Sequence, residues 1–304
     1  MSSKKYHDMF QEMMTIRDVF RLMLTLMNKH NLFYGHGTDN VWDEALALVF
    51  DSLKLPHEEH QTLFDAKLTK LEKENLADCL YKRVDERIPV PYITNKAWFA
   101  GLPFYVDERV IVPRSPFAEI IENEFAPWID SDNVSRVLDL CTGSACIAIA
   151  TAYYMPDVIV DAVDISEDAL AVAQDNVDKY QIDNQVNLIQ SDLFAALDGV
   201  KYDIIISNPP YVDKQDMDSL PEEFRHEPEL ALASGHDGLD ATTIILQQAK
   251  DHLNDNGILI VEVGNSQEAL IAKYPQVPFM WLDFERGGEG VFLLTKQQLE
   301  QYQF

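Results

Sequence analysis

Residues 137–150, VLDLCTGSACIAIA, run from a continuous apolar stretch into a turn of small residues and then into a second apolar stretch. The first part has the pattern of a buried strand, and the part from Ser144 has that of a buried helix. Small residues let the backbone of the turn approach a ligand, and the N-terminus of the following helix offers backbone N–H groups without partners. The stretch therefore predicts a strand, a turn and a helix with a ligand crevice at the turn.

The same alternation continues to the C-terminus. After RVLDL, the predicted strands are VIVDAVDI, QVNLIQ, YDIIIS and GILIVEV, and helices are expected from Glu167 and near Asp240 to Leu253. Alternating strands and helices are typical of a mostly parallel sheet with helices on both faces. The last two strand patterns, FMWLDFE and GVFLLT, lie close enough to pair as an antiparallel edge hairpin. The predicted fold class is therefore α/β, Rossmann-like and doubly wound.

The N-terminal part has a different pattern. From Tyr6 to about Arg87, apolar residues recur at three- and four-residue steps, as on amphipathic helices. NLFYGHGTDN ends in residues that cap helices, so a second helix is expected near Trp42. The prolines of ERIPVPY end the helical part, and KAWFAGLPFYVDERVIVP has the pattern of a hairpin. We predict a helical domain over 1–88, a connector and hairpin over 89–116, and the α/β domain over 117–304.

Composition restricts the possible partners. The 304 residues are 47% hydrophobic, which is ample for a large and a small packed domain. With 24 Lys and Arg against 51 Asp and Glu, the formal net charge is -27. This charge repels phosphate backbones and attracts basic proteins, although an acidic surface also serves solubility. We therefore expect no specific nucleic-acid partner.

Cysteine usage and hydropathy indicate the compartment. The three cysteines are too few and too irregularly spaced for a disulfide framework or a zinc site. The N-terminus has no apolar segment of a signal peptide, and no run approaches the roughly 18 apolar residues that span a bilayer. We therefore expect a cytoplasmic protein with no metal and no membrane contact.

The turn in residues 141–145 differs from the dinucleotide fingerprint G-x-G-x-x-G, because Cys141, Gly143 and Ala145 lie where many methyltransferases have three glycines. Asp164 ends the next strand, where an acid accepts hydrogen bonds from ribose hydroxyls. Asp192 follows the third strand and is placed to accept from an adenine amino group. Each Asp alone is also typical of a helix cap or a turn. Together, on successive strand ends, they favour an adenosyl pocket for S-adenosylmethionine.

The stretch SNPPYVD, residues 207–213, closes the strand YDIIIS. Pro209 and Pro210 remove two backbone donors and leave their carbonyl acceptors. The side-chain oxygen of Asn208 and a proline carbonyl can accept both hydrogens of a planar amide or aniline-like amino group, and Tyr211 is expected to pack on the flat substrate group. Positioning matters because an amide nitrogen is a poor nucleophile, and good orientation contributes roughly 7 to 11 kcal/mol. A strand-stopping turn is the alternative.

NPPY, together with RHEPELALASGHDGL at 225–239 and VEVG at 261–264, resembles the motifs of the HemK-type protein glutamine methyltransferases. The resemblance covers essentially the whole chain, because the N-terminal helices, the connector and the hairpin ending in VIVPRSP occur in that family's arrangement. It implies a class I methyltransferase domain, S-adenosylmethionine as donor and the glutamine side-chain amide nitrogen as acceptor. It also implies that the N-terminal helices recognise the substrate. NPPY alone is shared with amino-methylating DNA enzymes.

By motif position, the resemblance implies two sets of site residues. The catalytic set is Asn208, Pro209, Pro210 and Tyr211. The donor-binding set is Asp139, Cys141, Thr142, Gly143, Ser144, Ala145, Asp164, Asp192, Leu193 and Asn208. Ala145 replaces the family's usual glycine, so the turn either keeps a negative φ there or carries strain.

The residues after Arg114 bear on the substrate. Family members that modify release factors typically carry Pro, Glu, Thr and Glu there, whereas this chain has Ser115, Pro116 and Phe117. With LFYGHGTDN and ERIPVPYITNKAWFAG, this is similar to the branch that methylates a glutamine of large-subunit (50S) ribosomal protein L-three, free or during assembly. The acidic charge suits such a basic partner. Glutamine methylation of release factors, DNA adenine amino-methylation and a non-catalytic assembly factor remain as alternatives.

Overall fold

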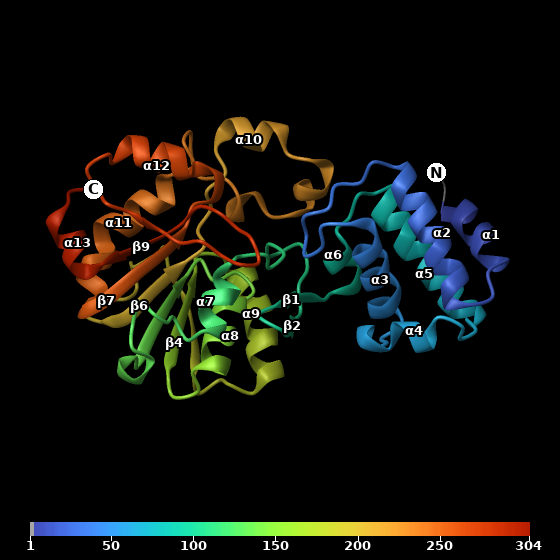
Figure 1. Cartoon of the computed structure of the whole chain (residues 1–304), viewed down its shortest axis with the longest axis horizontal. Coiled ribbons are helices and arrows are strands. Elements are labelled where there is room, and N and C mark those ends of the chain that lie inside the picture. Colours follow the sequence, from blue (N-terminus) through green and yellow to red (C-terminus); the bar gives the residue numbers. More distant parts are fainter. Residues whose placement is uncertain (1–2) are drawn as a thin grey trace. The chain divides into compact units, whose positions relative to one another are not determined.

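The computed structural model describes residues 3–304, which divide into two compact units (Figure 1). Unit 1 comprises the chain up to Ala97 with two later segments, Val106–Glu108 and Pro221–His226. Unit 2 comprises Trp98–Tyr105, Arg109–Leu220 and Glu227–Phe304. The two units therefore interleave along the chain, whereas the sequence pattern suggested contiguous segments.

Unit 1 is helical. Its helices are α1 (Ser3–Gln11), α2 (Ile16–Lys29), α3 (Val41–Ser52), α4 (His60–Leu63), α5 (Lys70–Val84) and α6 (Val90–Thr94). Thr15 and Thr69 form capping boxes that start α2 and α5, and the side chain of Asn40 caps α3. The apolar faces of these helices form one core. The helix predicted near Trp42 is confirmed as α3.

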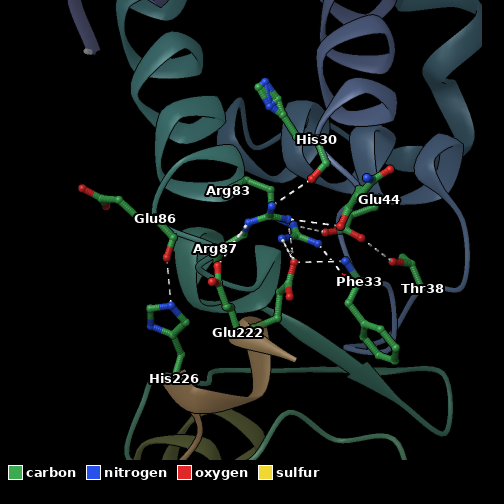
Figure 2. A network of polar contacts seen from close by, with 11 residues as sticks. His30, Phe33, Thr38, Glu44, Arg83, Glu86, Arg87, Glu222 and His226 are labelled. Carbon is green, nitrogen blue, oxygen red and sulfur yellow. Dashed lines mark hydrogen bonds and ion pairs between the residues drawn. The ribbon is translucent and has the colours of Figure 1, made fainter. Parts of the chain in front are cut away.

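A buried polar network lies inside unit 1 (Figure 2). Arg83 is 1% exposed, donates to Glu44 through Nε, and pairs through Nη1 with Glu223 Oε1 at 3.1 Å. Arg87 Nη1 contacts the same Glu223 oxygen at 3.4 Å. Two buried carboxylates thus meet two guanidinium groups, while Glu222, which also pairs with Arg87, is exposed. The buried charge is therefore balanced. Because Glu223 belongs to Pro221–His226, the network fixes this late segment in unit 1.

Within residues 3–304, seven strands form one sheet in unit 2, in the order β5-β4-β3-β6-β7-β9-β8. The strands are β3 (Arg136–Leu140), β4 (Ile159–Asp164), β5 (Val186–Gln190), β6 (Tyr202–Ser207), β7 (Leu253–Glu262), β8 (Met280–Trp281) and β9 (Val291–Thr295). Strands β3 to β7 pair in parallel, and β9 runs antiparallel to β7 and β8. The predicted mostly parallel sheet with an antiparallel edge is confirmed. The predicted hairpin is also present, as β1 (Ala97–Phe99) paired with β2 (Leu102–Phe104).

Helices cover both faces of the sheet, as Figure 1 shows for α8 and α9 against α11 and α12. The helices are α7 (Phe117–Glu122), α8 (Cys146–Tyr154), α9 (Glu167–Tyr180), α10 (Lys214–Ser219), α11 (Asp240–His252), α12 (Gln267–Lys273) and α13 (Lys296–Gln301). Successive strand residues point to opposite faces. Ile204 and Ile206 of β6 therefore join the core under α7, α8 and α9, and Ile205 joins the core under α11, α12 and α13.

The strand order reverses between β3 and β6, and ligands of such sheets bind at this switch point. Leu140 is in register with Ser207, whose Oγ donates to the Leu140 carbonyl at 2.8 Å. The turn at 141–145 and the segment from Asn208 therefore leave the sheet side by side. In residues 3–304, no helix combines the length and apolarity that a membrane crossing requires.

Candidate active site

A cavity of about 310 Å³ opens at the carboxyl ends of these strands, within unit 2. This volume lies at the lower end of the range for small-molecule sites. Among the predicted site residues, the cavity lining includes Cys141, Gly143, Asp164, Asp192, Leu193, Asn208 and Pro210. The described lining does not include Asp139, Thr142, Ser144, Ala145, Pro209 or Tyr211. The predicted residues thus form the cavity wall and a layer behind it.

The turn after β3 has an unusual backbone. Cys141, Gly143 and Ala145 all adopt left-handed conformations, with φ of 61°, 55° and 61°. These are the positions at which many methyltransferases have glycine, and glycine adopts positive φ without steric cost. A Cβ on Gly143 would meet nothing within 4 Å, so the backbone there is open to a ligand. The sequence left open whether Ala145 keeps a negative φ or carries strain, and the structure gives it a positive, strained φ.

We expect Ala145→Gly to be tolerated far better than Ala152→Gly, a matched change in α8. Both alanines are buried, and both changes remove a methyl group and add chain entropy to the unfolded state. Only Ala145→Gly also relieves left-handed strain, which is about 1–2 kcal/mol. Chemical denaturation should therefore show a difference of about this size between the variants. Equal losses of stability would contradict the strain at Ala145.

Asp139 lies behind the turn. Its side chain is fully buried, and Oδ2 accepts hydrogen bonds from Thr142 Oγ1 at 2.5 Å and from the Ala148 N–H at 3.2 Å. Oδ1 has no hydrogen-bond partner among the described residues. Burial raises the pKa of Asp139 to about 7. Asp139 therefore stabilises the turn through Oδ2, and its Oδ1 is left as an acceptor without a partner among the described residues.

Asp164 connects the end of β4 to the turn. Its carboxylate accepts from the backbone N–H groups of Gly143 and Ser166, each at 2.9 Å. Burial raises the pKa of Asp164, although these two donors favour the ionised form. Each oxygen keeps a lone pair for a further hydrogen bond. Asp164 can thus both hold the turn and face a ligand.

The cavity is acidic. The described lining includes the carboxylates of Asp164, Asp192 and Asp240, against the single guanidinium group of Arg109. Such a lining disfavours phosphate ligands and suits a ligand with positive charge. Among residues 3–304, no group of three or more His, Cys, Asp and Glu side chains is arranged to hold a metal ion.

Asn208 presents an unsatisfied acceptor. Asn208 is the cavity-lining first residue of the tetrad Asn208–Tyr211, and its Oδ1 is buried and has no hydrogen-bond partner within the described chain. Buried polar atoms without partners are uncommon because they cost free energy. The adjoining Pro209 and Pro210 contribute carbonyls and no N–H donors. This corner of the cavity is therefore suited to a ligand group that donates hydrogen bonds.

Sequence reasoning missed a large part of the cavity wall. Arg109–Ile111, which follows the hairpin, and Pro228–Ile244 both contribute lining residues. Within the second stretch, Leu230 remains 60% exposed. Glu227 fixes the start of this wall, because it accepts from Arg114 at 2.5 and 2.8 Å and from the Val112 N–H at 2.9 Å. RHEPELAL and VIVPRSP are recognisable in the sequence only as family motifs, since loop residues without periodicity give no signal of the surface they line.

The fold and the site together define a class I methyltransferase. Residues 125–237 match the family described as methyltransferase small domain. The hMettl16 catalytic domain, solved in complex with a MAT2A 3′UTR hairpin, shares the fold with a TM-score of 0.50 at 16% identity. That likeness covers 74% of this chain and 80% of the other.

Two relatives match over nearly the whole chain. The ribosomal protein uL3 glutamine methyltransferase of Francisella tularensis is 49% identical over 302 residues, which are 99% of this chain and 96% of that protein. The protein of the same name from Neisseria gonorrhoeae is 50% identical over 290 residues, 95% of this chain and 97% of that protein. The chain belongs to the family of ribosomal protein uL3 glutamine methyltransferases, which confirms the resemblance drawn from NPPY and its companion motifs.

Proposed function

We propose that this protein transfers a methyl group from S-adenosylmethionine to the side-chain amide nitrogen (N-5) of a glutamine in ribosomal protein uL3. The observation that carries the proposal is the buried, unsatisfied Oδ1 of Asn208 beside two prolines at the cavity. A primary amide offers two N–H donors in one plane, which is the complement of this set of acceptors.

The cavity fits the proposed donor. S-adenosylmethionine, when bound, supplies an electrophilic methyl group on a positively charged sulfur. The carboxylates of the lining favour a cationic ligand, and the bare backbone at Gly143 admits close approach. Asp164 would accept from the ribose hydroxyls and Asp192 from the adenine amino group. Cys141 and Leu193 would pack around the donor.

The tetrad would orient the acceptor. The Asn208 side-chain oxygen and a carbonyl of Pro209 or Pro210 would each accept one hydrogen of the glutamine amide. This arrangement draws electron density toward the nitrogen and aligns its lone pair with the methyl group. Orientation of this kind contributes roughly 7 to 11 kcal/mol to such reactions. No base is needed before the attack, because the nitrogen becomes strongly acidic only as it gains the methyl group. The nitrogen would then lose one proton to solvent, and the donor would leave as the neutral thioether S-adenosylhomocysteine.

Charge supports a ribosomal protein as the substrate. The formal net charge of -27 attracts a basic partner and disfavours nucleic acid. Both relatives named above act, by their names, on uL3. We propose that uL3 is modified free or during assembly, and that the helices of unit 1 take part in recognising it.

The test is a methylation assay on defined substrates. The purified protein is incubated with labelled S-adenosylmethionine and, separately, with uL3, a release factor and duplex DNA. We expect uL3 alone to gain the mass of one methyl group, and peptide mapping to locate it on a glutamine. Label on the release factor or on DNA, with none on uL3, would overturn the proposal in favour of the corresponding alternative.

A further inference from the structure

Glu262, the last residue of β7, lies buried behind the tetrad. Its side chain is 6% exposed, and it receives two hydroxyl donors: Ser115 Oγ at 2.6 Å on Oε2 and Tyr211 Oη at 3.2 Å on Oε1. Burial raises the pKa of Glu262, while these hydroxyls and the nearby Arg114 favour the ionised form. A buried carboxylate is costly unless hydrogen bonds satisfy it. Glu262 therefore holds both hydroxyl groups in fixed positions.

Tyr211 is fixed on two further sides. Its carbonyl accepts a hydrogen bond from Ser266 Oγ at 2.8 Å. Its ring lies against Gly264, where a Cβ would be only 2.6 Å from the ring atom Cε2. The described cavity lining includes Asn208 and Pro210 but not Tyr211. The hydroxyl, ring and backbone of Tyr211 are thus all anchored in the layer behind the cavity.

The anchoring of Tyr211 also restricts the orientation of the acceptors at Asn208 and Pro210, because they are connected through the backbone. The carbonyl of Pro210 and the N–H of Tyr211 share one planar peptide group. A shift of the Tyr211 backbone therefore turns the Pro210 carbonyl and is passed through Pro209 to Asn208. A displacement of about 1 Å at a reacting group costs on the order of 100-fold in rate.

We propose that Glu262, supported by Ser115, is a positioning residue for methyl transfer, because it anchors Tyr211 and Tyr211 sets the direction of the acceptors at Asn208 and Pro210. The proposal rests on the proposed function and deepens it. It gives a role to VEVG, which contains Glu262, and to Ser115. The proposed donor and acceptor contacts use neither.

The kinetic test compares Glu262→Ala and Glu262→Gln with Glu268→Ala, a matched change at an exposed position of α12. We expect Glu262→Ala to lower kcat per folded enzyme about 10- to 100-fold. KM for uL3 and the donor Kd should stay within about threefold of wild type, because Glu262 is absent from the described cavity lining. Glu262→Gln keeps an acceptor oxygen for Tyr211 and should recover most of kcat, a rescue that a purely structural role would not require.

Coupling provides the second readout. The double variant Tyr211→Phe with Glu262→Ala should be no slower than the slower single variant, since both remove the same contact. Losses that multiply, or a kcat of Glu262→Ala within about twofold of wild type, would overturn the proposal.

A spectroscopic readout separates this inference from the proposed function. With ¹³C-labelled tyrosine, the Tyr211 ring signal is assigned by its loss in Tyr211→Phe. It should shift in Glu262→Ala and not in Glu268→Ala, whether or not uL3 is the substrate. An unchanged signal would overturn the anchoring, whereas a wild-type protein that leaves uL3 unmethylated would overturn only the proposed function.

Discussion

Replacement of Asn208 by alanine is expected to lower kcat for methylation of uL3 by roughly 100- to 1,000-fold, the usual loss when one preorganised polar contact to a reacting group is removed. Asn208 Oδ1 is the buried acceptor at the cavity that has no partner among the described residues. Without it, the glutamine amide loses one of its two anchors and its lone pair is no longer held toward the methyl group. Steady-state rates at saturating donor and substrate measure the effect.

Two matched variants make the result specific. Asn208→Asp keeps a side-chain acceptor and should be more active than Asn208→Ala. Asn123→Ala, at the exposed end of α7, should behave like wild type. Donor affinity measured by calorimetry separates a loss of binding from a loss of chemistry. If Asn208→Ala keeps kcat within about tenfold of wild type, Asn208 does not have the orienting role proposed here.

Arg83→Met is expected to destabilise unit 1 by about 3–5 kcal/mol, the usual cost of removing one partner from a buried ion pair. Methionine fills similar space, but it removes the buried guanidinium that pairs with both Glu44 and Glu223. Glu44 then keeps a hydrogen bond from Thr38, and Glu223 keeps the Phe33 N–H and the Arg87 guanidinium. Hydrogen exchange should report the loss as faster exchange in α3 and α5, and also in Pro221–His226. Urea denaturation should give its magnitude.

The control for Arg83→Met removes the charge of the two carboxylates that lose their partner. Adding Glu44→Gln and Glu223→Gln to Arg83→Met should recover a large part of the lost stability, because most of the cost comes from unpaired buried charge. A loss below about 1 kcal/mol for Arg83→Met alone would show that water satisfies these groups and that the network contributes little.

The order of elements could be predicted from sequence because it depends on local periodicity. The apolar runs of β3 and β6 and the small-residue turn between β3 and α8 give clear patterns over ten or so residues. Even there, α8 begins at Cys146 rather than at Ser144, since residues 141–145 are held in left-handed turns. Sequence pattern alone left two conformations open for Ala145, because it does not report φ.

The parts that sequence reasoning missed depend on contacts between distant residues. Arg83 and Glu223 are 140 positions apart, and no periodicity connects them. Glu262, Ser115 and Tyr211 likewise meet only because β7 lies next to β6 in the sheet. Carboxylates at strand ends could be predicted as ligand-binding residues from the sequence. Packing decides which of them line the cavity and which lie in the layer behind it. Asp139 is the example, since it lies behind the turn and not in the described lining.

The interleaving of the two units limits how such a protein can be recombined. A helical unit made only of the N-terminal residues would lack Glu223, and Arg83 would then keep only part of its partners. We expect an exchange of this N-terminal part between relatives to keep its stability only if Pro221–His226 is exchanged with it. The N-terminal helices are therefore not a separable module, because their fold depends on a segment more than one hundred positions away.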